Sequence, residues 1–210
     1  MSTLGDETYL RLRKMILDGV LKPGAAIQEN ALAKTLKVSR TPVREALGRL
    51  ASEELITRQS GQPPTVRGVS LQDYIEILHM RRLLEVEAAG LAARKPDMTA
   101  LARLRADVEG LIATDDPADE RHMTIDDNVH SSIAEMSGSG LLQRTIQDLR
   151  LKTRIFDLGG IPNRFLSSCQ EHLVLLDAIA SGDTDAARAS MTVHIDNVRE
   201  SILNDLRQLF

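Results

Sequence analysis

The feature that most constrains the fold of this chain is a pair of helical patterns, over residues 28–37 and 43–50, with only a few residues between them. Apolar residues in both segments recur three and four positions apart, which is the spacing of one buried helix face. The break contains Ser39 and Thr41, either of which can cap a new helix, and Pro42, which a first helical turn tolerates. Two short helices joined by so tight a turn predict a helix-turn-helix.

The flanking segments complete a winged version of this motif. Apolar residues at helical spacing over 10–17 predict an earlier helix. Two short strands are expected at 55–58 and 65–69, and the polar turn 59–62 joins them as a wing. These elements make residues 1–70 a small winged helix-turn-helix domain.

The exposed face of the second motif helix carries side chains that can bind DNA. Arg40, Thr41 and Arg44 cluster on its first turn, the end that enters the major groove in a helix-turn-helix. An Arg can bond O6 and N7 of guanine together, while Thr41 and backbone N–H groups can hold phosphates. The alternative is a three-helix scaffold whose arginines are merely solvated.

The charge of the chain is unevenly distributed. Residues 1–70 hold eleven Lys and Arg against seven Asp and Glu, a net charge of about +4. Residues 71–210 hold 15 against 23, a net charge of about −8. A basic head on an acidic body suits a protein that touches nucleic acid with one end only.

The body, residues 71–210, is expected to be helical throughout. Aromatic residues make up only 2% of the sequence and Trp is absent, so the core must be built from aliphatic side chains and Met, which suits packed helices. Helices are expected at about 71–95, 99–113, 119–137, 139–157, 163–180 and 184–208. Because short breaks join them, they predict an antiparallel bundle. The expected fold class is mostly α, a winged helix-turn-helix followed by a bundle of about six helices.

Features of secretion and membrane insertion are missing from the sequence. No apolar stretch approaches the roughly 20 residues that span a bilayer, and the N-terminus lacks the basic region and apolar run of a secretion signal. Cys169 is the only cysteine, so disulfides do not support the fold. These features indicate a cytoplasmic protein without a membrane partner.

Within the expected bundle, one carboxylate and three imidazoles can converge. Asp126 and His130 are four residues apart and so share a helix face. His172 lies nine residues before the break at 181–183 and His194 eleven after it, so an antiparallel hairpin puts both at a similar height. This ligand set suits Zn²⁺, Ni²⁺, Co²⁺ or Mn²⁺ and leaves coordination positions for a small molecule. The alternative is four unrelated surface or core side chains.

The head closely resembles the GntR family of bacterial regulators. The residues that carry the resemblance are Pro23-Gly24, Leu32-Ala33, Val38-Ser39-Arg40-Thr41-Pro42-Val43-Arg44-Glu45-Ala46-Leu47 and Leu50. The resemblance implies that Ser39, Arg40, Thr41 and Arg44 contact DNA and that Gly61, at the wing tip, reaches the minor groove. Asn30 is a departure, because several family members place a DNA-contacting Arg there.

The body is similar to the FCD effector domain of the FadR-like branch of that family. Asp126-x-x-x-His130, Glu171-His172 and His194 resemble its metal-ligand pattern, and Arg81-Arg82-Leu-Leu-Glu85 fits its first helix. Six helices match the shorter, VanR-like form of the domain. Val129 stands where a bulky residue such as Phe often precedes the motif histidine, which leaves the ligands intact.

The resemblance and the chemistry of such a site together imply a small organic acid as the effector. A carboxylate can chelate the metal while a guanidinium takes its other oxygens. Arg81 and Arg154 are the candidates for this contact, and the alternative for each is an ordinary ion pair.

These expectations describe a ligand-responsive repressor or activator that binds a palindromic operator as a homodimer and is gated by the acid at the metal. Two alternatives stay open. One is a sensor for which the metal ion is itself the effector. The other is a metallohydrolase on the same four residues, although no further Glu or Asp is spaced to act as its general base.

Overall fold

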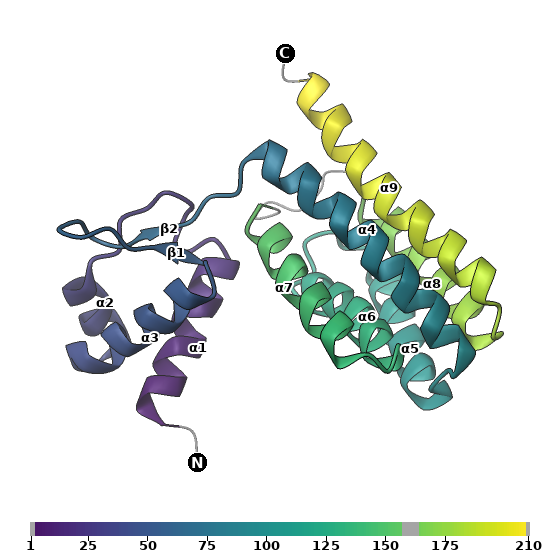
Figure 1. Cartoon of the computed structure of the whole chain (residues 1–210), viewed down its shortest axis with the longest axis horizontal. Coiled ribbons are helices and arrows are strands. Elements are labelled where there is room, and N and C mark those ends of the chain that lie inside the picture. The colour runs from purple at the N-terminus through teal and green to yellow at the C-terminus, as the bar shows by residue number, and fades with distance from the viewer. Residues whose placement is uncertain (1–2, 157–163, 209–210) are drawn as a thin grey trace. The chain divides into compact units, whose positions relative to one another are not determined.

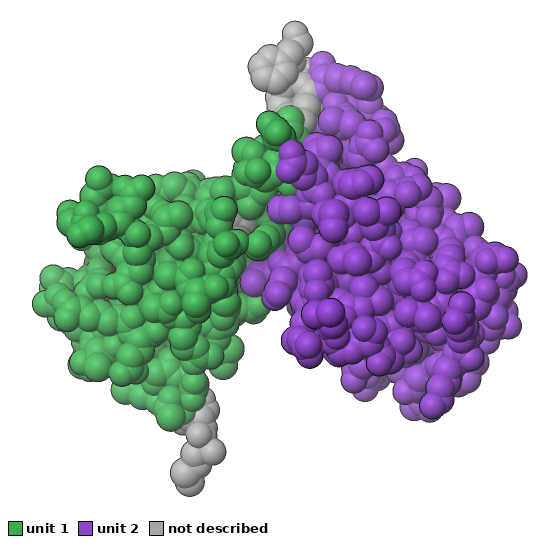
Figure 2. Space-filling model, viewed as in Figure 1, with its two compact units in different colours: residues 1–74, 152–158 green, residues 75–151, 159–210 purple. Residues whose placement is uncertain are grey.

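The computed structural model describes residues 3–156 and 164–208 of the chain. Over these residues the chain forms two compact units, coloured separately in Figure 2. The first holds residues 3–74 and 152–156, and the second holds residues 75–151 and 164–208.

Three helices and a small antiparallel sheet form the first unit (Figure 1). They are α1 (Leu4–Leu17), α2 (Glu29–Leu36), α3 (Arg40–Ser52), β1 (Ile56–Thr57) and β2 (Thr65–Val66). Ile56 pairs with Val66 across the two strands, and Ala26 forms a further bridge to Thr65. The core is aliphatic and includes Leu12, Ile16, Ile27, Leu36, Val43, Ala46, Leu47, Leu50, Leu55 and Val66, all buried. This is a winged helix-turn-helix, as the sequence predicted.

The turn between α2 and α3 is tight because Lys37 adopts a left-handed backbone conformation, with φ at 57°. The N–H of Val38 then bonds back to the carbonyl of Ala33 at 3.0 Å, which closes the end of α2. Ser39 is the N-cap of α3 and has extended backbone angles, although its side chain makes no capping hydrogen bond. The chain therefore reverses within a few residues and presents the first turn of α3 to solvent.

The second unit is an all-helical bundle. Its described helices are α4 (Leu71–Arg94), α5 (Met98–Thr114), α6 (His122–Met136), α7 (Gly140–Phe156), α8 (Phe165–Ala180) and α9 (Thr184–Gln208). Figure 1 shows the long helices α4 and α9 side by side, and two ion pairs join them, Arg82–Asp196 at 2.8 Å and Arg188–Glu87 at 2.9 Å. The small buried residues of α4, Ala88, Ala89, Ala92 and Ala93, let neighbouring helices approach closely.

The expected fold class is confirmed, and the differences lie at element ends. Helix α1 begins at Leu4 rather than near residue 10, because Thr3 and Asp6 form a capping box that extends it toward the N-terminus. The strands are only two residues long each. Among the described residues, no helix is long and apolar enough to cross a membrane.

Candidate metal centre and nucleic-acid interface

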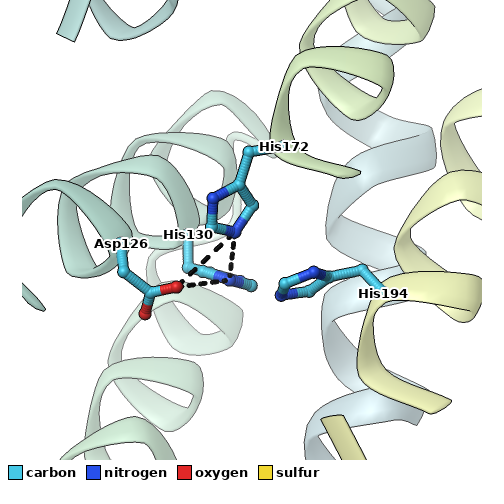
Figure 3. Close-up of side chains that lie close together, drawn as sticks. All are labelled: Asp126, His130, His172 and His194. Atoms are coloured by element: carbon cyan, nitrogen blue, oxygen red, sulfur yellow. Dashed lines mark hydrogen bonds and ion pairs between the residues drawn. The ribbon is translucent and has the colours of Figure 1, made fainter. Parts of the chain in front are cut away.

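Four side chains from three helices meet inside the second unit (Figure 3). Asp126 and His130 project from α6, His172 from α8 and His194 from α9. One potential ligand atom of each residue lies within 4.8 Å of those of the other three. Each histidine is only 2% exposed, whereas 24% of the Asp126 side chain is exposed. The structure thus brings together the carboxylate and imidazoles that the sequence predicted to converge.

The separations within this cluster fit the donor set of one transition-metal ion. Nε2 of His172 lies 3.3 Å from Nε2 of His130 and 3.6 Å from Oδ1 of Asp126. Nε2 of His130 lies 4.0 Å from the same carboxylate oxygen. Ligand atoms bonded to one ion at about 2.0–2.1 Å stand roughly 2.8–3.4 Å apart at right or tetrahedral angles. Small side-chain rotations would therefore close the set around an ion.

Carboxylates behind two of the imidazoles, one buried and one partly exposed, fix their orientation. Nδ1 of His130 contacts Oε2 of Glu85, which is 1% exposed. Nδ1 of His194 lies 2.9 Å from Oε2 of Glu171. A carboxylate accepts the Nδ1–H of a histidine, and this selects the tautomer whose Nε2 lone pair is available to a metal.

Each of these carboxylates forms an ion pair with an arginine side chain. Nε of Arg81 donates to Glu85 at 2.6 Å, and Arg164 donates two hydrogen bonds to Glu171, at 2.8 and 2.6 Å. Burial alone would raise the pKa of Glu85, but the charge of Arg81 and the contact with His130 outweigh it and hold that pKa below its usual value. Burial also opposes ionisation of Glu171, yet hydrogen bonds from His194, Arg164 and Asn197 lower its pKa to about 2. Both carboxylates are ionised at neutral pH.

Arg150 of α7 holds the remaining member of the cluster. Its Nη2 lies 2.6 Å from Oδ2 of Asp126 and 2.8 Å from Oδ1 of Asp127, and the residue is 7% exposed. Burial would raise the pKa of Asp126, but the charge of Arg150 and then the histidines keep it well below the usual range. Because Arg150 occupies Oδ2, Asp126 presents Oδ1 to the histidines as a single ligand atom.

Two histidines of the cluster, His130 and His172, are in the protonation state that metal ions require. Burial, and then the charge of Arg150, lowers the pKa of His130 to about 4. Burial, followed by the effect of His194, holds the pKa of His172 well below its usual value. Both rings are therefore neutral at pH 7, and neutral imidazole is the form that binds metal.

The two arginines expected to contact an effector have different environments. Arg81 is 6% exposed and pairs with Glu85, the carboxylate that contacts His130. Most of α7 belongs to the second unit, but residues 152–156 at its end belong to the first. Arg154 lies in this last turn, and its Nη2 is 3.8 Å from Oδ1 of Asp18. Both arginines form ion pairs, and an ion pair does not exclude a contact with an effector.

The five predicted DNA contacts all lie on exposed parts of the first unit. Ser39, Arg40, Thr41 and Arg44 lie at the exposed start of α3. Gly61 lies in the turn of the wing with φ at 76°, a conformation that favours glycine, and the N–H of Gln62 bonds the carbonyl of Gln59 at 3.1 Å across this turn. The start of α3 and the wing tip therefore offer a basic helix end and a slender loop.

Sequence reasoning missed Arg150 altogether, and it gave Glu85 and Glu171 no individual roles. The signals for the two carboxylates are local, since Arg81 and Glu85 are four residues apart on one helix and Glu171 directly precedes His172. Arg150 has no such signal, because its contact with Asp126 joins residues 24 positions apart on two helices.

Comparison with known proteins matches both units. Residues 4–66 match the model of "Bacterial regulatory proteins, gntR family", and residues 76–197 match that of the "FCD domain". The Nta operon transcriptional regulator of Aminobacter aminovorans is 28% identical over 189 residues, which cover 89% of this chain and 88% of that protein. The HTH-type transcriptional repressor RspR of Escherichia coli is 26% identical over 205 residues, covering 95% and 89%. The structure of E. coli McbR/YncC superposes with a TM-score of 0.82 at 26% identity, over 97% of this chain and 99% of that one.

Proposed function

Because the chain belongs to the GntR family of bacterial regulatory proteins and carries an FCD domain, we propose that it is a transcription regulator gated by a small carboxylate, which binds at a metal ion in the helical unit. Its relatives are transcriptional regulators rather than enzymes, so the metallohydrolase alternative is set aside. The observation that carries the proposal is the convergence of Asp126, His130, His172 and His194 within 4.8 Å.

For the DNA side, we propose that Ser39, Arg40, Thr41 and Arg44 enter the major groove and that Gly61 approaches the minor groove. One winged head makes few contacts, and a two-fold dimer doubles them on a palindromic site. The proposed assembly is therefore a homodimer on a palindromic operator. Since it acts on DNA, its place of action is the cytoplasm.

For the effector side, the four cluster residues would hold one Zn²⁺, Ni²⁺, Mn²⁺ or Co²⁺ ion, which supplies positive charge and open coordination positions to a carboxylate. Four protein ligands leave two positions in an octahedral shell, enough for two oxygens of a small acid. Arg81 and Arg154 stay candidates for a second contact with the acid. We add Arg150, because its guanidinium lies 2.6 Å from Asp126 in the cluster.

The test uses a duplex that the wild-type protein selects from a random-sequence library. Fluorescence anisotropy then measures the affinity of metal-loaded and metal-stripped protein for this duplex, with a panel of small mono-, di- and tricarboxylic acids. We expect at least one acid to change the affinity of the metal-loaded protein by roughly 5- to 150-fold, a typical allosteric coupling. The metal-stripped protein should not respond.

Two results would contradict gating by a carboxylate bound at the metal ion. A change in affinity with metal alone, unaffected by any acid, would favour the metal-sensor alternative. Equal responses to an acid with and without metal would remove the ion from the mechanism.

A further inference from the structure

The first residue of α2, Glu29, contacts both arginines of the proposed DNA interface. Nε of Arg44 donates to Oε2 of Glu29 at 2.8 Å, and Nη2 of Arg40 lies 3.8 Å from the same oxygen. The side chain of Glu29 is 21% exposed, whereas those of Arg40 and Arg44 are 55% and 58% exposed. A half-buried carboxylate thus lies behind two solvent-facing guanidinium groups.

A third cation acts on the same carboxylate. The pKa of Glu29 is lowered chiefly by the hydrogen bond from Arg44, and then by the charges of Arg44, Arg40 and Arg58. Arg58 follows β1 at the start of the wing turn. Glu29 therefore stays ionised and faces cations from two elements of the interface, the start of α3 and the wing.

The bond to Glu29 has a geometric consequence for Arg44. This hydrogen bond is donated by Nε of Arg44, so it leaves both terminal Nη nitrogens of Arg44 for the bidentate contact with O6 and N7 of one guanine. An exposed Arg side chain carries about 2 kcal/mol of rotamer entropy. Fixing Nε on a half-buried carboxylate lowers the entropy that is lost when Arg44 docks on a base.

The same carboxylate has an electrostatic consequence. Binding to non-specific DNA depends on how many phosphates the protein neutralises. A negative charge beside Arg40 and Arg44 reduces the favourable electrostatic free energy of their contacts with DNA phosphates, and this reduction does not depend on the DNA sequence. The charge of Glu29 therefore lowers the affinity for specific and non-specific DNA alike. The orientation that Glu29 gives to Arg44 raises the affinity only where the correct base is present.

We propose that Glu29 sets DNA sequence specificity, by orienting Arg44 for base recognition and by offsetting the charge of Arg40 and Arg44 on non-specific DNA. This inference rests on the proposed function, because it takes both arginines as DNA contacts. Glu29 is a positioning residue: it acts through the arginines and does not itself bind the DNA.

The test compares two DNA probes, the duplex selected by the wild-type protein and a 30-base-pair duplex of scrambled sequence. We expect Glu29→Gln to bind the scrambled duplex about 5- to 10-fold more tightly at 0.1 M salt, with a steeper salt dependence, because one net positive charge is added per protomer. Affinity for the selected duplex should rise by less than twofold or fall. The ratio of the affinity for the selected duplex to that for the scrambled duplex then drops at least about 2.5-fold.

A matched control and a double variant separate this effect from a general charge effect. Glu45→Gln makes the same charge change on α3, at an exposed side chain next to Arg44 in the sequence, and should leave the ratio within twofold of wild type. In an Arg44→Ala background, Glu29→Gln should change the ratio much less than it does in the wild type. Circular dichroism verifies that each variant is folded.

Several results would overturn the inference. An unchanged ratio in folded Glu29→Gln would contradict it, and so would an equal rise in affinity for both duplexes. If the wild-type protein selects no duplex at all, the proposed DNA recognition itself fails, and that outcome is distinct from a selected duplex whose recognition ignores Glu29.

Discussion

An imidazole has two ring nitrogens, and for two histidines of the Asp126, His130, His172 and His194 cluster a carboxylate determines which nitrogen would be available to a metal ion. Glu85 takes Nδ1 of His130 and Glu171 takes Nδ1 of His194. The arginines behind these carboxylates help to keep them ionised, so the orientation of these two imidazoles depends on a chain of charged side chains. At the residue scale, the proposed site therefore consists of the imidazoles together with the carboxylates and arginines that orient them.

The first prediction concerns the carboxylate behind His130. Glu85→Gln should weaken metal binding by about 10- to 100-fold, because an amide holds the Nδ1–H of His130 less strongly than a carboxylate does. Calorimetric titration of the metal-stripped chain with Zn²⁺ measures this. Glu87→Gln is the matched control, since Glu87 lies on the same helix and pairs with Arg188 at 52% exposure. Equal losses in both variants would contradict the role of Glu85.

The second prediction concerns the arginines at the start of α3. Arg40→Ala and Arg44→Ala should each weaken binding to the selected duplex by about 1–3 kcal/mol if they contact bases. Arg103→Ala, a substitution on α5 of the helical unit, should leave the affinity unchanged. A gel-shift titration in which both head variants bind like wild type would remove the assignment of α3 as the recognition helix.

At the scale of elements, the α2–α3 turn depends on a residue in an unfavourable conformation. Lys37 has a φ of 57°, where a side chain costs about 1 kcal/mol and glycine costs nothing. Lys37→Gly should therefore raise the free energy of unfolding of the first unit by up to about 1 kcal/mol. Lys34→Gly, inside α2, should lower it by about 1 kcal/mol.

Urea denaturation followed by circular dichroism compares these two variants with wild type. Opposite signs for the two glycines would show that the left-handed turn, and not the loss of a lysine charge, decides the outcome. Destabilisation by both substitutions would mean that the Lys37 side chain contributes more than its backbone conformation costs.

The elements themselves were predictable because their signals are local. The spacing of Val43, Ala46, Leu47 and Leu50 identified α3, and the break at 181–183 set the hairpin of α8 and α9. The start of α1 was placed too late, because its signal is the polar capping box of Thr3 and Asp6 rather than apolar spacing. The contact of Arg150 with Asp126 was unpredictable for a different reason, since it depends on how α6 and α7 pack.

At the scale of the whole molecule, the proposed assembly is a pair of chains. We predict that the full chain sediments as a dimer at micromolar concentration, because two heads are needed for tight binding to a two-fold operator. Analytical ultracentrifugation of the metal-loaded chain tests this. A single species with the mass of one chain at that concentration would argue against the dimer.

The proposed ion would also join α6, α8 and α9, so it should stabilise the folded helical unit. Anything that binds only the native state stabilises it by about 2.7 kcal/mol when its free concentration is 100 times Kd. We predict that Zn²⁺ or Ni²⁺ raises the melting temperature of the metal-stripped chain and that a chelator reverses the rise. An unchanged melting temperature at saturating metal would contradict a link between these helices.

The most direct test of the account is the metal stoichiometry of the full chain, measured by calorimetric titration of metal-stripped protein with Zn²⁺, Ni²⁺, Mn²⁺ and Co²⁺. We predict one ion per wild-type chain for at least one of these metals. His172→Ala and His194→Ala should abolish this binding, while His79→Ala, at an exposed histidine of α4, should retain it. A wild-type chain that takes up none of the four ions, or binds them equally well without His172 and His194, would contradict the proposed site.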